Sequence, residues 1–425
     1  MVRYVLYALL FLFVGMTGPV IEPDTGSYYH LDIITTPGYP AFLYGFKKIF
    51  SAHYGWYVIF IQLLIVLVSS HYVIKTFQKY FQSSHIILFF MEVLFLLPIV
   101  LPEYLVVNRI VSEALAYPIF LMIMSLLLDG LLANNTKYLW RCFIAVGIGI
   151  LVRPQFNFIL PVILIIFGYE WFRTKNLKRF GSLIVSLVLL PFVILILNKS
   201  YHYLVQGYFT NTANTGVLIM TLPMYVADAN DYKVYEDPRQ QAYFNYVYAE
   251  AKKTKVLEDY AKPKYNENGY RHFHDIYAEL SFGVLSGKGR AFLYPEAPGT
   301  SKAVIGNNAF LIDMYWPLLV DNFSKVMTLF YHNFLHAFHG WYMIILHLLI
   351  VVIAFYYWIK ERSALSLISL FLLLSVFSNT ILVCSMLHSI DRYFMYHQWA
   401  LPVLLLLAMN PFNARINTIP QKNNS

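Results

Sequence analysis

The chain opens with the apolar stretch VRYVLYALLFLFVGMTGPVI (Val2 to Ile21), and the acidic and aromatic run EPDTGSYY (residues 22–29) follows it. The apolar stretch is long enough to cross a bilayer, and Arg3 marks its cytoplasmic end. No small-x-small cleavage pattern follows, so we expect it to be retained as a span. Asp24 then emerges at the far membrane surface, where a carboxylate can accept a proton from a substrate held in the lipid. The simpler explanation is a solvated aspartate that caps a turn.

The composition identifies a polytopic membrane protein. The chain has 425 residues, of which 59% are apolar and 13% charged, and its mean hydropathy is +0.56. A soluble domain has about twice that charged fraction. The net charge of +8 is explained largely by cytoplasmic anchoring residues, so we expect no nucleic-acid partner. Cys142 and Cys384 lie far apart in apolar stretches and indicate neither a disulfide framework nor a zinc site.

Ten apolar stretches are candidate membrane spans: 4–21, 55–74, 84–102, 112–132, 139–153, 156–172, 181–198, 340–358, 363–384 and 394–410. With the N-terminus in the cytoplasm, thirteen basic residues fall at cytoplasmic ends and five in short outer segments, counting outside the long loop. This bias predicts that both termini are cytoplasmic. The basic residues counted as cytoplasmic are Arg3, Lys75, Lys79, Lys137, Arg141, Arg173, Lys175, Lys178, Arg179, Lys360, Arg362, Arg415 and Lys422.

The predicted fold is therefore an all-α polytopic membrane protein with about ten transmembrane helices and one large extracytoplasmic loop. Residues 1–198 form a seven-helix module with the first outer loop, residues 199–339 the large loop with interfacial helices, and residues 340–425 a three-helix module and a cytoplasmic tail. The large loop is rich in tyrosine, which suits sugar rings and the membrane interface alike. Its piece from Arg239 to Leu257 has a helical composition.

Three further charged residues fall on the same membrane side as Asp24. Glu113 starts the fourth predicted span, Arg153 lies at the turn between two short spans, and Arg392 precedes the last span. Each has a simpler explanation: Glu113 as an N-terminal helix charge beside the cap Ser112, Arg153 as a snorkelling side chain, and Arg392 as an anchor. Together, two arginines can grip a phosphate bidentately, and two carboxylates can share the work of a base.

These residues resemble a family. The first-loop Asp24, the segment Pro37-Gly38-Tyr39-Pro40, Ser112-Glu113, the Arg153-Pro154 pair after a Gly-x-Gly, and Arg392-Tyr393 are similar to motifs of the GT-C glycosyltransferases. The resemblance is to the bacterial relatives of dolichyl-phosphate-mannose protein mannosyltransferases, and it covers residues 1–200 and 391–393. One departure is that Thr25, rather than a second acid, follows Asp24.

The resemblance implies a site and a reaction. Asp24 matches the general base and Glu113 the second acid, while Arg153, Arg392 and Tyr393 match the contacts of the donor phosphate. Tyr28, His30 and Tyr39 are the candidate acceptor contacts of the first loop. The donor would be a monosaccharide carried on a polyprenyl phosphate, and a hexosyl or pentosyl group would pass, with inversion, to a lipid, protein or glycan acceptor. The expected location is the bacterial inner (plasma) membrane, with the active site outside the cytoplasm and membrane lipids around it.

No cofactor is implied with certainty, and a divalent metal is possible but not indicated. His332, His336 and His339 share one face of a predicted helix, yet no carboxylate at metalloprotease spacing accompanies them.

Two other functions stay open. A polysaccharide polymerase of the O-antigen type would hold pyrophosphate with loop arginines such as Arg239. A lipid or ion transporter without chemistry would show two related halves, which the sequence lacks.

Overall fold

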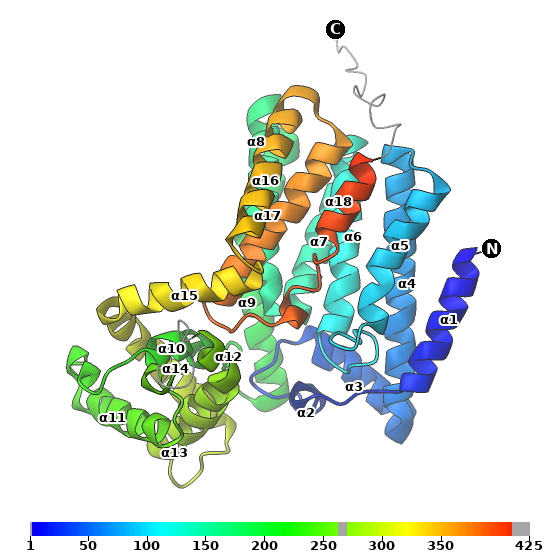
Figure 1. Cartoon of the computed structure of the whole chain (residues 1–425). Helices are drawn as coiled ribbons and strands as arrows, with labels where there is room; N and C mark the ends of the chain where they lie inside the picture. The colour runs from blue at the N-terminus through cyan, green and yellow to red at the C-terminus, as the bar shows by residue number, and fades with distance from the viewer. Residues whose placement is uncertain (1, 262–269, 410–425) are drawn as a thin grey trace.

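The structure is a computed structural model that describes residues 2–261 and 270–409 (Figure 1). Within these ranges the chain is helical, and its one β-type contact is an isolated parallel bridge between Val20 and Arg109. The larger group of helices forms an elongated bundle (Figure 1). Its members are α1 (Val2–Thr17), α3 (Gly38–Phe50), α4 (Tyr54–Phe81), α5 (His85–Val100), α6 (Glu113–Leu132), α7 (Thr136–Val152), α8 (Ile159–Thr174), α9 (Ser182–Gln206), α16 (Trp341–Glu361), α17 (Ala364–Cys384) and α18 (Ala400–Ala408).

A second group of helices lies beside one end of this bundle (Figure 1). Tyrosine, phenylalanine and aliphatic side chains of these helices form a separate hydrophobic core, which includes Tyr225, Tyr243 and Phe273. The tyrosines of the large loop therefore supply packing as well as surface. The helices are α10 (Thr215–Tyr225), α11 (Pro238–Lys253), α12 (Tyr270–Ala278), α13 (Gly289–Leu293), α14 (Ser301–Asp321) and α15 (Phe323–Ala337).

Helix α6 is the centre of the bundle. The side chains of α6 itself are apolar on every face, so the helix must be covered on all sides. Helices α4, α7 and α17 pack against it. Its first residue, Glu113, is buried as well. By contrast, α9 and α16 expose long rows of apolar side chains, as expected for helices that face lipid.

The prediction of an all-α polytopic membrane protein is confirmed. Among the described residues, seven helical stretches are long and apolar enough to cross a membrane. They are Gly38–Phe81, Glu113–Leu132, Pro154–Thr174, Leu177–Gln206, Ser301–Asp321, Trp341–Glu361 and Ala364–Cys384. One of the seven, Ser301–Asp321, lies inside the predicted large loop.

Several element bounds differ from the sequence prediction. The stretches predicted as spans at 4–21, 84–102 and 139–153 are helices α1, α5 and α7 of 16, 16 and 17 residues. In the predicted span 394–410, residues 394–399 form turns and α18 has 9 residues. The turns occur because Tyr396 and Trp399 are buried against Phe120 of α6, so this segment fills the core of the bundle. Helix α9 continues to Gln206, past the predicted boundary at residue 198.

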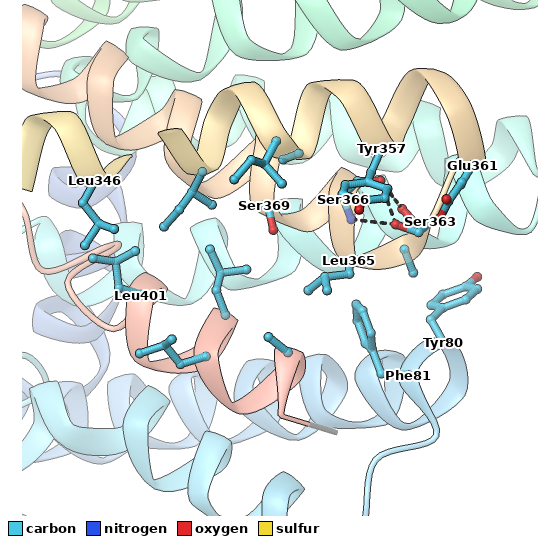
Figure 2. Close-up of a pocket in the computed structure, with 17 residues that line it drawn as sticks. Tyr80, Phe81, Leu346, Tyr357, Glu361, Ser363, Leu365, Ser366, Ser369 and Leu401 are labelled. Carbon is cyan, nitrogen blue, oxygen red and sulfur yellow. Dashed lines mark hydrogen bonds between the residues drawn. The ribbon is translucent and has the colours of Figure 1, made fainter. Parts of the chain in front are cut away.

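An apolar groove runs along the bundle between α16, α17, α4 and α18 (Figure 2). Its volume is about 470 Å³. Leu346 and Leu401 line it towards one end, and Tyr80, Ser363 and Ser366 give its other end polar groups (Figure 2). Such a shape fits a hydrocarbon chain rather than a polar solute.

Candidate active site

The short helix α2 (Pro23–Tyr29) carries Asp24 and is fastened to the segment that precedes α6. The Thr25 hydroxyl accepts a hydrogen bond from the Glu22 N–H at 2.9 Å and donates one to the Ile110 carbonyl at 2.9 Å. The Val20 N–H donates to the Asn108 carbonyl at 2.8 Å. Asp24 is therefore in the first turn of a fixed helix, not in a loose loop.

Glu113 is the centre of a buried ion cluster. Its side chain is 2% exposed, and its two oxygens bind two different arginines. Arg153 Nη1 lies 2.7 Å from Oε2, and Arg392 Nε lies 3.0 Å from Oε1. Arg153 follows α7 and Arg392 lies in the segment before α18, so one carboxylate joins two parts of the bundle that are far apart in sequence.

Arg392 also reaches the first loop, but more loosely. Its Nη2 is 3.6 Å from Asp24 Oδ2, and its Nη1 is 3.9 Å from Glu22 Oε2. Both distances exceed those of a short charge-assisted hydrogen bond. The Nε edge of Arg392 thus forms an ion pair with Glu113 without hydrogen-bond geometry, while its outer edge has capacity left for an anion that enters beside Asp24.

Ser112 and two tyrosines complete the cluster. The Ser112 hydroxyl accepts from Arg153 Nη1 at 3.0 Å and lies 3.2 Å from the Tyr28 hydroxyl. The Tyr393 ring lies below both guanidiniums, at 5.5 Å from Arg153 and 5.9 Å from Arg392. Ser112 occupies the N-cap position of α6 but makes no side-chain cap hydrogen bond, so the simpler explanation of Ser112 as a side-chain cap is not supported. It binds the arginine and the first loop instead.

The Pro-Gly segment of the first loop meets the Arg153 turn at close range. A Cβ atom at Gly38 would lie 2.7 Å from the backbone of Val152, which is too close for any other residue without movement. Gly38 therefore lets α3 approach the end of α7. Any larger residue at position 38 would push α3 away from Val152. The glycine before Tyr39 therefore allows the first loop and Arg153 to lie beside the same site.

The electrostatics of the site favour a reactive Asp24. Its side chain is 54% exposed, yet the protein around it removes part of its hydration. This desolvation and the nearby charge of Glu113 raise the pKa of Asp24 above its ordinary value of 3.8, against the opposing effect of Arg392. Burial, the largest single influence, would lower the pKa of Arg392, but the charges of Glu113, Tyr393 and Asp24 together outweigh it and raise that pKa, which keeps the guanidinium charged.

The structure brings most of the predicted site residues together. Asp24, Glu113, Arg153, Arg392, Tyr28 and Tyr393 form the cluster described above, which we call the Glu113 cluster. Tyr39 stands behind it: its ring packs edge-on against Tyr28 at 5.1 Å and its hydroxyl donates to Gln62 at 2.8 Å. His30 is exposed after the end of α2, where its ring contacts Tyr29, and no contact with the cluster is recorded for it.

Two members of the cluster are absent from the prediction. Glu22 Oε1 lies 3.2 Å from Arg109 Nε, and Glu22 Oε2 faces Arg392. The sequence feature that points to Glu22 is its place in the run Glu22-Pro23-Asp24. A helix that starts at Pro23 sets both carboxylates at the same end of α2. The first loop therefore has a second acid beside Asp24. It is Glu22, which precedes Asp24 in the sequence.

A second buried carboxylate, Glu170, lies at the opposite end of the bundle, near the end of α8. Its side chain is 0% exposed, and its Oε2 lies 2.7 Å from Arg362 Nη2 and 3.1 Å from Arg173 Nη2. Arg362 belongs to the turn between α16 and α17, at the top of Figure 1. The prediction had counted these arginines only as anchoring charges.

Among residues 2–261 and 270–409, no group of three or more His, Cys, Asp or Glu side chains is placed to hold a metal ion. No protein-family model, curated protein or solved structure matches the chain. The fold and the site define the class of protein by themselves: an all-α membrane protein that gathers acids and arginines at one end of its helices.

Proposed function

We propose that the protein is a glycosyltransferase of the GT-C type, which moves a monosaccharide from a polyprenyl phosphate to an acceptor hydroxyl at the extracytoplasmic face of the membrane. One observation carries this proposal: the half-exposed carboxylate of Asp24 lies 3.6 Å from Arg392, which shares Glu113 with Arg153. A base and two guanidiniums are thus within reach of one small reacting centre.

Each group has a defined part in the reaction. The acceptor oxygen forms a bond to the anomeric carbon, and the bond between that carbon and the phosphate oxygen breaks. Asp24 takes the proton from the acceptor hydroxyl, and polyprenyl phosphate leaves with the electron pair. Arg392 and Arg153 stabilise the charge that grows on the phosphate. Glu113 holds both guanidiniums in place, and Tyr393 supports them from below.

The apolar groove of Figure 2 offers a place for the isoprenoid chain. Leu401 and Leu405 on α18 line it, and α18 follows directly after the segment that carries Arg392 and Tyr393. A donor whose phosphate lies at the Glu113 cluster then extends its chain along the bundle towards Ser363. Helix α16 lines the groove and also exposes apolar side chains to the lipid. A long chain can therefore enter the groove from the bilayer.

The orientation that this reaction needs has both termini in the cytoplasm and α2 outside, in the inner membrane of a bacterium. The basic residues at the other end of the bundle, Arg173, Lys175 and Arg179 among them, support that sidedness. Reporter fusions after Lys175 are expected to read cytoplasmic, and fusions between residues 230 and 260 external. The reverse pattern would contradict the orientation.

A donor assay tests the function. Purified protein in liposomes is given a radiolabelled polyprenyl-phosphate sugar, and release of polyprenyl phosphate is measured separately from movement of intact donor across the bilayer. A glycosyltransferase cleaves the donor when acceptor is present, and the Asp24→Asn variant does not. Asp32→Asn is the matched control, since Asp32 lies in the same loop and makes no recorded contact with the cluster. Movement of intact donor without cleavage would identify a transporter.

A further inference from the structure

The Glu170 end of the bundle has a surplus of positive charge. Three arginines surround this carboxylate: Arg173 and Arg362 pair with it directly, and Arg179 lies within electrostatic range of both Glu170 and Arg362. The Arg179 guanidinium donates to the Gly130 carbonyl at 2.9 Å, a partner that carries no charge. One carboxylate therefore faces three cations, which we call the arginine cluster.

Each arginine of the arginine cluster also has a hydrogen-bond donor without a partner. Within the described part of the chain, the Nε atoms of Arg173, Arg179 and Arg362 are buried and have no hydrogen-bond partner. Burial lowers the pKa of Arg362, and the charge of Glu170 does not restore it to the ordinary value. Guanidiniums in this state are stabilised by an anion that accepts from Nε and Nη together.

The surroundings of the cluster indicate that this anion belongs to a lipid. Trp171, Phe172 and Leu177 lie beside the arginines in sequence and are 42%, 72% and 62% exposed. Exposed aromatic and aliphatic side chains at the end of membrane-spanning helices mark the interface between hydrocarbon and headgroups. Glu361, next to Arg362 in the chain, lines the groove of Figure 2.

We propose that the arginine cluster binds the phosphate of an anionic phospholipid headgroup, with Arg173, Arg179 and Arg362 as its ligands. The phosphate diester of phosphatidylglycerol has one negative charge and two free oxygens, each of which can accept hydrogen bonds from more than one guanidinium N–H group. Because the end of α8, the π-helical segment Leu177–Gly181 and the α16–α17 turn each supply one arginine, the lipid ties three segments together. The site is independent of the proposed transfer reaction.

Thermal unfolding in detergent micelles tests the proposal. Phosphatidylglycerol is expected to raise the Tm of the wild-type protein, whereas phosphatidylcholine with the same chains has little effect. Arg179→Gln is the main variant, since Arg179 forms no direct ion pair with Glu170 and its loss leaves that pairing intact. We expect it to raise the half-saturating lipid concentration about tenfold, as for the loss of one charge-assisted hydrogen bond. Lys360→Gln, an exposed cation on α16, is the control and should leave the lipid response unchanged.

Three results would overturn the proposal. Equal stabilisation by phosphatidylcholine would show that the headgroup charge is irrelevant. Equal weakening by Lys360→Gln would show general attraction to an anionic surface rather than a site. Inorganic phosphate that stabilises as well as the lipid would identify a soluble anion as the ligand. Native mass spectrometry of the wild-type protein gives a second measurement, in which phosphatidylglycerol should stay bound after phosphatidylcholine has been removed.

Discussion

Glu113 and Glu170 stand at opposite ends of the same bundle, and each is a buried carboxylate that bridges two arginines. Their neighbourhoods differ in charge. In the Glu113 cluster, ion pairs join three carboxylates to three arginines, because Glu22 and Asp24 accompany Glu113. In the arginine cluster a single carboxylate faces three arginines. Both clusters contain buried ions. Only the Glu113 cluster has as many carboxylates as arginines and is therefore neutral without a ligand.

The difference indicates what each end does. A neutral cluster that exposes one carboxylate at its edge is stable without a ligand and keeps that carboxylate available for a proton. A positively charged cluster at the lipid interface is stabilised by an external anion. By our two proposals, the same residue types serve transfer chemistry at one end and lipid binding at the other. The count of opposite charges, rather than the presence of arginine, separates the two roles.

The largest expected effect comes from neutralising the two bridging carboxylates. Glu113→Gln and Glu170→Gln each leave buried guanidiniums without their counter-charge, and we expect a loss of about 3–5 kcal/mol in the free energy of unfolding. Phosphatidylglycerol should reduce this loss for Glu170→Gln and not for Glu113→Gln. Denaturant unfolding with and without the lipid measures both. An equal lipid response in the two variants would remove the distinction between the clusters.

A smaller effect is expected when a guanidinium is replaced by an ammonium. Arg392→Lys keeps the charge and loses the planar fork, so donor use should fall about tenfold, or roughly 1.4 kcal/mol. Arg362→Lys is the matched change at the other end and should leave kcat/KM for the donor within about twofold, since it is far from the reacting atoms. Steady-state kinetics per folded molecule compare them. Tolerance of lysine at Arg392 would make this arginine a membrane anchor.

The smallest effect concerns the pH dependence of transfer. Asp24 must be ionised to accept a proton, so activity should rise with pH through its raised pKa and then level off. Glu22 is one of the charges that raise this pKa. Glu22→Gln should therefore move the acid limb of the kcat/KM profile to lower pH, and Glu361→Gln at the other end should not move it. A limb that stays in place, or moves to higher pH, would mean that Asp24 is not the titrating base.

The sequence predicts the helical membrane fold well, because long apolar stretches have few other stable structures. It also predicts the main members of the Glu113 cluster, since acids and arginines at membrane depth must pair. The helix predicted from Arg239 to Leu257 occurs as α11 (Pro238–Lys253), whose bounds follow from the cap Asp237 and the proline after it.

Other features depend on tertiary packing and could not be predicted. Residues 394–399 open the predicted span 394–410 but form turns, because their aromatic rings fit between helices of the core. Glu170 appears in the sequence as an ordinary acid three residues before Arg173, and its burial and its pairing with the distant Arg362 are visible only in the fold. His30 lies at the exposed end of α2, where its ring packs against Tyr29, so its role as an acceptor contact stays a prediction.

The most direct test of the central claim measures donor binding and donor turnover separately in Asp24→Asn. The amide keeps the shape of the side chain and cannot accept the proton, while Arg153 and Arg392 stay paired with Glu113. Donor affinity should change by less than about threefold, and single-turnover transfer should fall about 10²–10⁴-fold, or roughly 3–5 kcal/mol of barrier. Transfer within a few-fold of the wild-type rate would contradict the claim that Asp24 is the base of this site.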